Sequence, residues 1–306
     1  MERTDMKESD RTNTALQDFM LESRLKKLDP DLHMRFTDTV IAVMKILFRF
    51  QLMFPEFTDH SELHSISVLD FCNRLIGPEQ AEQLNADEIY TLMMSCYLHD
   101  VGMGVTQDQF QEFSREIDFG DYYEKHPDAL PGQVIRDFHH EFSAAFIRRY
   151  GEMLDIPTEE HLFAIIQVCR GHRRTDLFDE KEYPLHYTVP NGNEIHLPYL
   201  AALIRLADEI DVAADRNPKM LYDMESFTSE HQIAFHKRHE AVRDIIVTRE
   251  AFLMHVMHVD PVIDQMVEEM CEKMEDTLHY CSRVALERSP FRITQRDVLI
   301  QWSRQD

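Results

Sequence analysis

A capping-box pattern at Asn85 and Glu88 starts a helix whose apolar run ends in two adjacent polar side chains, His99 and Asp100. Gly102 follows shortly afterwards, and we expect it to cap the C-terminal end of this helix. A buried aspartate without a partner is strongly unfavourable, because its charge is removed from water. The fold must therefore bring a cation or a donor group to Asp100.

Most of the chain has apolar residues at helical spacing, and only 8 of its 306 residues are glycine. These features predict a mostly α fold, a helical bundle with one or two small β-hairpins and a C-terminal helical extension. The expected helices cover approximately residues 15–28, 37–54, 59–76, 85–101, 133–150, 158–172, 198–216 and 261–287.

Two segments alternate in the manner of short β-strands. Residues 184–198 contain the turn pair Asn191-Gly192, which is typical of a two-residue hairpin turn, and residues 242–256 alternate more weakly. We expect three parts within one compact unit: an N-terminal helical segment at 1–56 that packs on the core, a core domain at 57–217, and a C-terminal hairpin with a long helix at 218–306.

The charge balance of the chain limits its partners. Its 56 acidic residues outnumber the 32 lysines and arginines, for a formal net charge of −24. This balance disfavours binding to nucleic acid, where neutralisation of phosphates supplies much of the affinity. The five cysteines form no CxxC pair, no apolar run is long enough to span a bilayer, and the N-terminus lacks a signal peptide. We therefore expect a cytoplasmic protein without a membrane partner.

Some of the 17 histidines lie on or at the end of apolar helices, where a ligand site is one interpretation and a core histidine with a satisfied hydrogen bond is the other. Aspartates recur in the same positions. A divalent cation needs several nitrogen and oxygen donors from different elements, and a helical bundle can supply them. The candidates are His60, His64, His99, Asp100, His139, His140, His172, Asp208 and Asp211.

The order of these residues resembles the HD superfamily of metal-dependent phosphohydrolases. The phrases HDVGM, RxxHxxxS, CRGH and LADEID are similar to those of its HD-CE-like subgroup, whose domains occur alone or beside Hsp90-type ATPases in bacterial conflict systems. The resemblance covers about residues 57–217 and, more loosely, the C-terminal part. It implies an HD-domain bundle and an antiviral defence setting, with a homo-oligomer or a partner ATPase as possible partners.

The resemblance implies a divalent transition metal site of one or two ions, with Mn, Fe, Ni, Co, Zn or Mg as the candidate metals. In the two-metal reading, one ion is held by one set of residues and the second by another, with Asp100 shared and counted among the catalytic residues. A one-metal site is the alternative. The first set is His64, His99, Asp100 and Asp208, and the second is His139, His172 and Asp100.

This chain departs from some relatives at two positions. Met103 stands where some HD enzymes carry a lysine, and Arg173 stands where some two-metal members carry a histidine. His140 and His60 are therefore candidates for the catalytic acid or for phosphate contacts, and the alternative for each is a supporting hydrogen bond or surface exposure.

Three arginines and one aspartate are the candidate substrate-binding residues. Arginine matches the geometry of phosphate, although salt bridges to the abundant acidic residues are the alternative. We expect the aspartate to orient a ligand or an arginine rather than to bind metal. These residues are Arg136, Arg170, Arg173 and Asp211.

The function that these residues imply is hydrolysis of a phosphoester or phosphoanhydride bond by metal-activated water. A small phosphorylated substrate, a nucleotide, fits the acidic chain better than a polymer does. Two alternatives stay open: a metal-dependent nuclease acting on single strands, and a non-catalytic, metal-stabilised module that senses a nucleotide or binds a partner.

Overall fold

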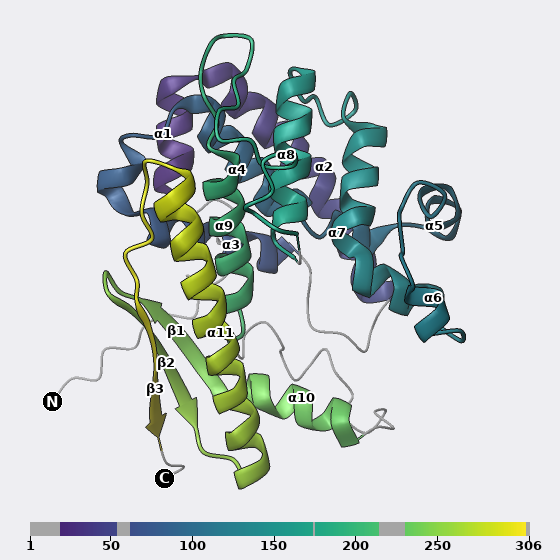
Figure 1. Cartoon of the computed structure of the whole chain (residues 1–306), viewed down its shortest axis with the longest axis vertical. Coiled ribbons are helices and arrows are strands. Elements are labelled where there is room, and N and C mark those ends of the chain that lie inside the picture. Colours follow the sequence, from purple (N-terminus) through teal and green to yellow (C-terminus); the bar gives the residue numbers. More distant parts are fainter. Residues whose placement is uncertain (1–18, 54–61, 174, 214–229, 304–306) are drawn as a thin grey trace, which may run out of the picture.

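The computed structural model describes residues 19–53, 62–173, 175–213 and 230–303, and it has the predicted mostly α fold with a small sheet (Figure 1). None of the described helices combines the length and apolar character that a membrane-spanning helix needs. The helices are α1 (Met20–Leu28), α2 (Pro30–Met53), α3 (Glu62–Ala81), α4 (Ala86–Leu98), α5 (Gln107–Phe113), α6 (Tyr122–Lys125), α7 (Pro131–Tyr150), α8 (Glu159–Gly171), α9 (Leu197–Ile210), α10 (Glu230–Ala241) and α11 (Pro261–Arg288). The strands are β1 (Val242–Val247), β2 (Ala251–Met257) and β3 (Asp297–Ser303).

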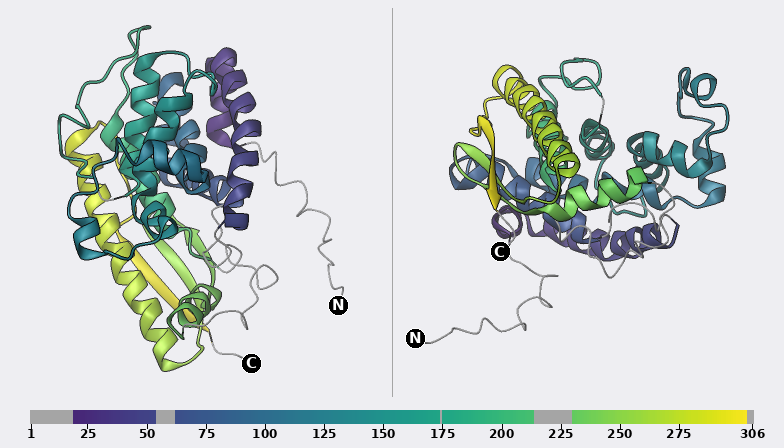
Figure 2. Two further views of the ribbon diagram at one scale, coloured as in Figure 1. Left: turned by 90° about the vertical axis from the view of Figure 1, so that its right-hand side faces the viewer. Right: turned by 90° about the horizontal axis from the view of Figure 1, so that it is seen from below.

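Helix α4 is the central element of the bundle, and nearly all of its residues are buried. Its predicted capping box is present, because the Asn85 side chain accepts from the Glu88 amide and the Glu88 carboxylate accepts from the Asn85 amide. Helices α1, α2, α3, α8 and α9 pack on α4. Figure 2 shows α1 and α2 on the opposite flank of the bundle from α11. The apolar run before His99 therefore anchors that residue in the core.

Gly102 does not cap α4 as the sequence predicted. The helix ends at Leu98 with His99 as its C-cap, and Gly102 lies in a short 3-10 helix that packs on α7. A Cβ atom on Gly102 would lie 2.4 Å from the Ser143 amide nitrogen, so glycine permits a close backbone approach here. The Gly102 amide donates to Ser143 Oγ, which in turn donates to the His99 carbonyl. These contacts fix the His-Asp turn against α7.

The two predicted hairpins have different outcomes. The second is formed by β1 and β2, which pair antiparallel with a register irregularity between Val242 and Asp244. The first is reduced to a single bridge between Thr188 and Glu194. Pro190 lies directly before the turn pair and lacks an amide donor, which limits further pairing.

The C-terminal part contains two elements that the sequence pattern did not predict, α10 and β3. Strand β3 pairs in parallel with β2, which gives the order β1-β2-β3. Helix α11 packs on both α9 and β3, and α10 packs beside α11. The C-terminal elements are thus joined to the bundle through α9, the helix that carries Asp208.

Candidate metal centre

Each of the four histidines predicted as metal ligands lies at the beginning, the end or a break of a helix. His64 lies in the first turns of α3, and His99 and His172 are the C-caps of α4 and α8. His139 follows Phe138, whose backbone angles (φ −117°, ψ 18°) break α7. All four rings are buried. The ends of three helices and the break in a fourth therefore meet inside the bundle.

The first group of donors consists of His64, His99 and Asp208. His64 Nε2 lies 3.2 Å from His99 Nε2 and 3.2 Å from Asp208 Oδ1. Asp100 Oδ2 lies 3.5 Å from the Nε2 atom of each of these histidines. Ligands at about 2.1 Å from one ion would lie about 3 Å apart, so these spacings suit a bound cation.

The second group consists of Asp100, His139 and His172. His139 Nε2 lies 2.8 Å from His172 Nε2, and Asp100 Oδ1 lies 3.4 Å and 3.7 Å from these two atoms. The two carboxylate oxygens of Asp100 thus face different groups, Oδ2 the first and Oδ1 the second. This is the arrangement that a carboxylate bridging two ions requires.

The other ring nitrogen of each histidine faces an acceptor. His64 Nδ1 lies 2.6 Å from Asp211 Oδ2, and His99 Nδ1 lies 3.0 Å from the Cys96 carbonyl oxygen. The Nδ1 atoms of the other two face the carbonyl oxygens three residues upstream, those of Arg136 and Cys169. The Nδ1 atoms must therefore donate, which in a neutral ring leaves the lone pair on Nε2.

Four Nε2 lone pairs then converge beside the oxygens of two carboxylates. Such an arrangement of acceptors is repulsive unless a cation lies among them, since acceptors need a donor or a positive charge. The donor set, imidazole nitrogen with carboxylate oxygen, suits a divalent transition metal. The residues therefore fit one or two divalent ions, with the two groups as the two sites.

Burial and neighbouring charges hold these groups in the protonation states that bind metal. Burial lowers the pKa of His139 to about 3 and that of His172 well below its usual value, so both rings are neutral at pH 7. Burial alone would raise the pKa of Asp208, but without a metal a proton on His64 Nε2, shared with Asp208 Oδ1, outweighs it and holds that pKa well below 3.8. A bound cation would take the place of that proton. Neutral imidazoles and an ionised carboxylate are the ligand forms.

A cavity of about 370 Å³ opens onto the centre. Asp100, His139 and Asp208 line it, and Met103 contributes an apolar side chain. Arg136 and Arg173, two of the predicted substrate-binding residues, also line it. The sequence did not indicate the far wall, which α10 and α11 form with Phe235, Arg238, His239, Glu269, Met270 and Lys273.

His60 lies outside the described residues, and the remaining candidate residues lie around the centre. The His140 ring lies beside those of His139 and His172, at centroid distances of 6.0 Å and 6.4 Å, but does not line the cavity. Asp211 is buried, and its Oδ2 atom lies 2.6 Å from His64 Nδ1, a contact that is compatible with the expected role of orienting a ligand.

Arg170 is placed differently from its predicted role in substrate binding. Its guanidinium forms a forked ion pair with Glu141, with distances from 2.9 to 3.1 Å, and a second with Glu182 at 3.1 Å. It does not line the cavity. Arg170 therefore has the salt bridges that were the alternative to phosphate binding, and two carboxylates already occupy its donors.

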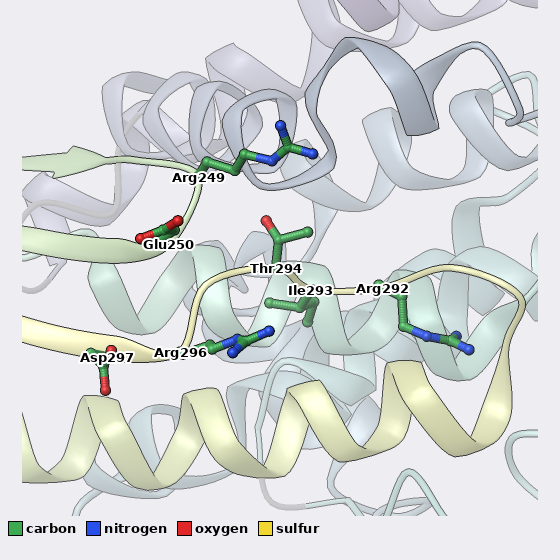
Figure 3. A pocket seen from close by; sticks show the side chains of 7 residues that line it. All are labelled: Arg249, Glu250, Arg292, Ile293, Thr294, Arg296 and Asp297. Atoms are coloured by element: carbon green, nitrogen blue, oxygen red, sulfur yellow. The ribbon is translucent and has the colours of Figure 1, made fainter.

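A second hollow, of about 630 Å³, also carries arginines but differs in chemistry. Figure 3 shows Arg249 at the turn between β1 and β2, and Arg292 and Arg296 on the segment that leads into β3. Glu250 and Asp297 also line this hollow, and no histidine does. An arginine-lined hollow is thus not by itself a metal centre, and of these two hollows the first is the one that contains converging ligand atoms.

Comparison with known proteins adds one finding. The sequence model of a protein family described as HD-CE matches residues 54–282. No curated protein matches the chain. The matched region contains all the described donors of both groups and the wall formed by α10 and most of α11.

Proposed function

Because the chain belongs to the HD-CE family, we propose that it is a metal-dependent phosphohydrolase that acts on a small phosphorylated molecule, a nucleotide. One observation carries the proposal: the two oxygens of Asp100 each face a different pair of histidine Nε2 atoms. A shared carboxylate between two ligand groups supports a centre that places two ions side by side, as many phosphate-cleaving sites do.

Bound divalent ions would supply charge to polarise the phosphoryl group and would lower the pKa of a coordinated water. The residues of the chain have separate tasks. His64, His99 and Asp208 hold one position, and His139 and His172 hold the other, with Asp100 between them. In this proposal, Arg136 and Arg173 bind oxygens of the phosphoryl group from the cavity wall, where their guanidinium groups add positive charge.

The leaving group is constrained by Met103. This side chain lines the cavity and carries no proton, so the position supplies no general acid. A phosphoanhydride releases a phosphate, whose second pKa is about 6, and its departure depends less on protonation than that of an alkoxide. We therefore favour a phosphoanhydride over a phosphoester as the bond that is cleaved.

The test is a panel of nucleoside mono-, di- and triphosphates, cyclic nucleotides and oligonucleotides with Mn²⁺, Mg²⁺, Ni²⁺ and Co²⁺. The full chain is compared with the double variant His99→Ala/Asp100→Ala. We expect release of phosphate or pyrophosphate from a nucleotide by the wild type alone. Turnover of oligonucleotides alone would identify a nuclease. Metal binding without turnover of any substrate would contradict the proposal and favour a non-catalytic module.

A further inference from the structure

Arg238, on the cavity wall formed by α10 and α11, has an unusual environment for an arginine in an acidic chain. Its Nε atom is buried without a hydrogen-bond acceptor among the described residues. None of the described carboxylates forms an ion pair with Arg238, although acidic residues outnumber basic ones by 56 to 32 in the chain. Arg170, by contrast, is paired with two carboxylates.

Neutral groups hold the Arg238 side chain in place. Its guanidinium lies 4.6 Å from the centroid of the Phe235 ring, and its Nη2 atom donates to His239 Nε2 at 3.2 Å. His239 Nδ1 faces the Val212 carbonyl oxygen at 3.1 Å, so its Nε2 atom is the acceptor in a neutral ring. The guanidinium is thus fixed by a ring stack and an imidazole, and none of the described carboxylates compensates its positive charge by direct contact.

Burial has an electrostatic consequence for this group. It lowers the pKa of Arg238, and the charges of Glu209 and Glu269 only partly oppose that effect. An arginine remains protonated even so, because its reference pKa is above 12. A partly desolvated cation that is already oriented is a favourable binding partner for an anion, since little ordering remains when the ligand arrives.

The scissile phosphoryl group does not need this charge. Two divalent ions would be neutralised only in part by Asp100 and Asp208, so the metal side of the cavity already favours one phosphoryl group. Arg136 and Arg173 add positive charge on that side. The uncompensated charge of Arg238 therefore calls for a second anionic group on the same small molecule.

We propose that Arg238 binds a second phosphoryl group of the substrate, beyond the one held at the metal centre. The substrate class is then a small molecule with at least two phosphoryl groups, and a nucleoside monophosphate is a poor ligand. This inference rests on the proposed function for the location of the first phosphoryl group. The cavity, of about 370 Å³, is in the range of small-molecule pockets.

The test is calorimetric binding to the Mn²⁺-loaded full chain, with three probes: AMP, α,β-methylene-ADP and adenosine 3′,5′-bisphosphate. We expect at least one of the two bisphosphorylated probes to bind about tenfold tighter than AMP, as a charge-assisted contact provides. In Arg238→Gln this difference should fall below about threefold while the affinity for AMP is kept. Arg238→Lys should retain part of it, because the charge remains but the planar fork is lost.

Arg296→Gln is the matched control, because it removes the same charge from the second hollow (Figure 3). It should preserve the preference for bisphosphorylated probes. The inference is overturned if the wild type shows no such preference, if Arg238→Gln keeps it, or if Arg238→Gln weakens all three probes equally. Metal content and helical circular dichroism identify a variant that does not fold. If Arg238→Gln does not fold, the preference measured with Arg238→Lys decides whether Arg238 binds the second phosphoryl group.

Binding and turnover separate this inference from the proposed function. If the preference is present but no nucleotide is hydrolysed, the hydrolase proposal fails and the second phosphoryl site stands. If nucleotides are hydrolysed but the preference is absent, the hydrolase proposal stands and the role of Arg238 is refuted.

Discussion

Two buried clusters of histidine and carboxylate can be compared among the described residues, and one of the two is built like a ligand site. In the cluster around Asp87, His161 Nε2 lies 2.9 Å from Asp87 Oδ1, and His161 Nδ1 lies 2.9 Å from Thr158 Oγ1. Asn191 and Asn193 donate to the same carboxylate. Every ring nitrogen and carboxylate oxygen there has a partner with which it can share a hydrogen.

At the candidate metal centre, by contrast, hydrogen-bond acceptors face other acceptors. The Nε2 atoms of His64 and His99 face each other at 3.2 Å, and those of His139 and His172 at 2.8 Å, while each Nδ1 atom already faces an acceptor. Burial alone therefore does not distinguish a structural histidine from a ligand. The distinction lies in whether the hydrogen bonds of the cluster can be completed without a cation.

The largest effect that separates the two clusters is expected from Asp100→Ala. This change removes the carboxylate that both ligand groups share, so the protein should lose metal at both positions. The loss of hydrolysis should exceed the roughly 100-fold that changes outside the ligand shell cause. Metal content by mass spectrometry, together with turnover, measures it. A variant that retains two ions per chain would show that Asp100 does not bridge.

Asp87→Ala should have the opposite effect: the free energy of unfolding should fall while the metal content stays unchanged. The substitution leaves His161 and two asparagines without their shared acceptor, and breaking a buried pair of this kind destabilises by about 3 kcal/mol or more. Denaturant unfolding of the metal-free protein measures it. Lost metal binding in a folded Asp87→Ala protein would contradict the separation of the two clusters.

Asp211→Ala tests the contact that most closely resembles the Asp87 cluster, a carboxylate that bonds to the Nδ1 atom of a buried histidine. Here that histidine, His64, is a candidate ligand. Removing the acceptor should lower the affinity for metal by about 10- to 100-fold, because the tautomer and orientation of His64 are no longer fixed. Competition with a chelator measures the affinity. Asp211→Asn, which keeps an acceptor oxygen, should lose less.

The apolar helices pointed to a larger set of histidines and aspartates, the resemblance to the HD superfamily singled out six of them as metal ligands, and the structure brings these six together in two groups. The residues of the cavity wall formed by α10 and α11 could not be predicted from the sequence. Helix α10 has no clear apolar face, so neither it nor Arg238 stood out in the sequence. Strand β3 pairs with β2 from about forty residues away, a partner that local alternation does not reveal. Arg170 forms ion pairs with Glu141 and Glu182, which come from other segments, so these contacts could not be predicted from the local sequence.

The smallest expected effect is an acid-dependent loss of stability at the Asp87 cluster. Burial alone would raise the pKa of Asp87, but hydrogen bonds from His161, Asn193 and Asn191 lower it from 3.8 to about 2. A carboxyl with a lowered pKa stabilises the fold above its unfolded pKa, and the contribution is lost as the pH falls towards the folded value. Between pH 5 and pH 3 this loss should be about 1 kcal/mol. Urea unfolding of the metal-free wild type and Asp87→Asn measures it, since the variant cannot titrate at this position and should show a shallower pH dependence. Equal slopes for the two proteins would mean that the Asp87 carboxylate is not held in its ionised form by its partners.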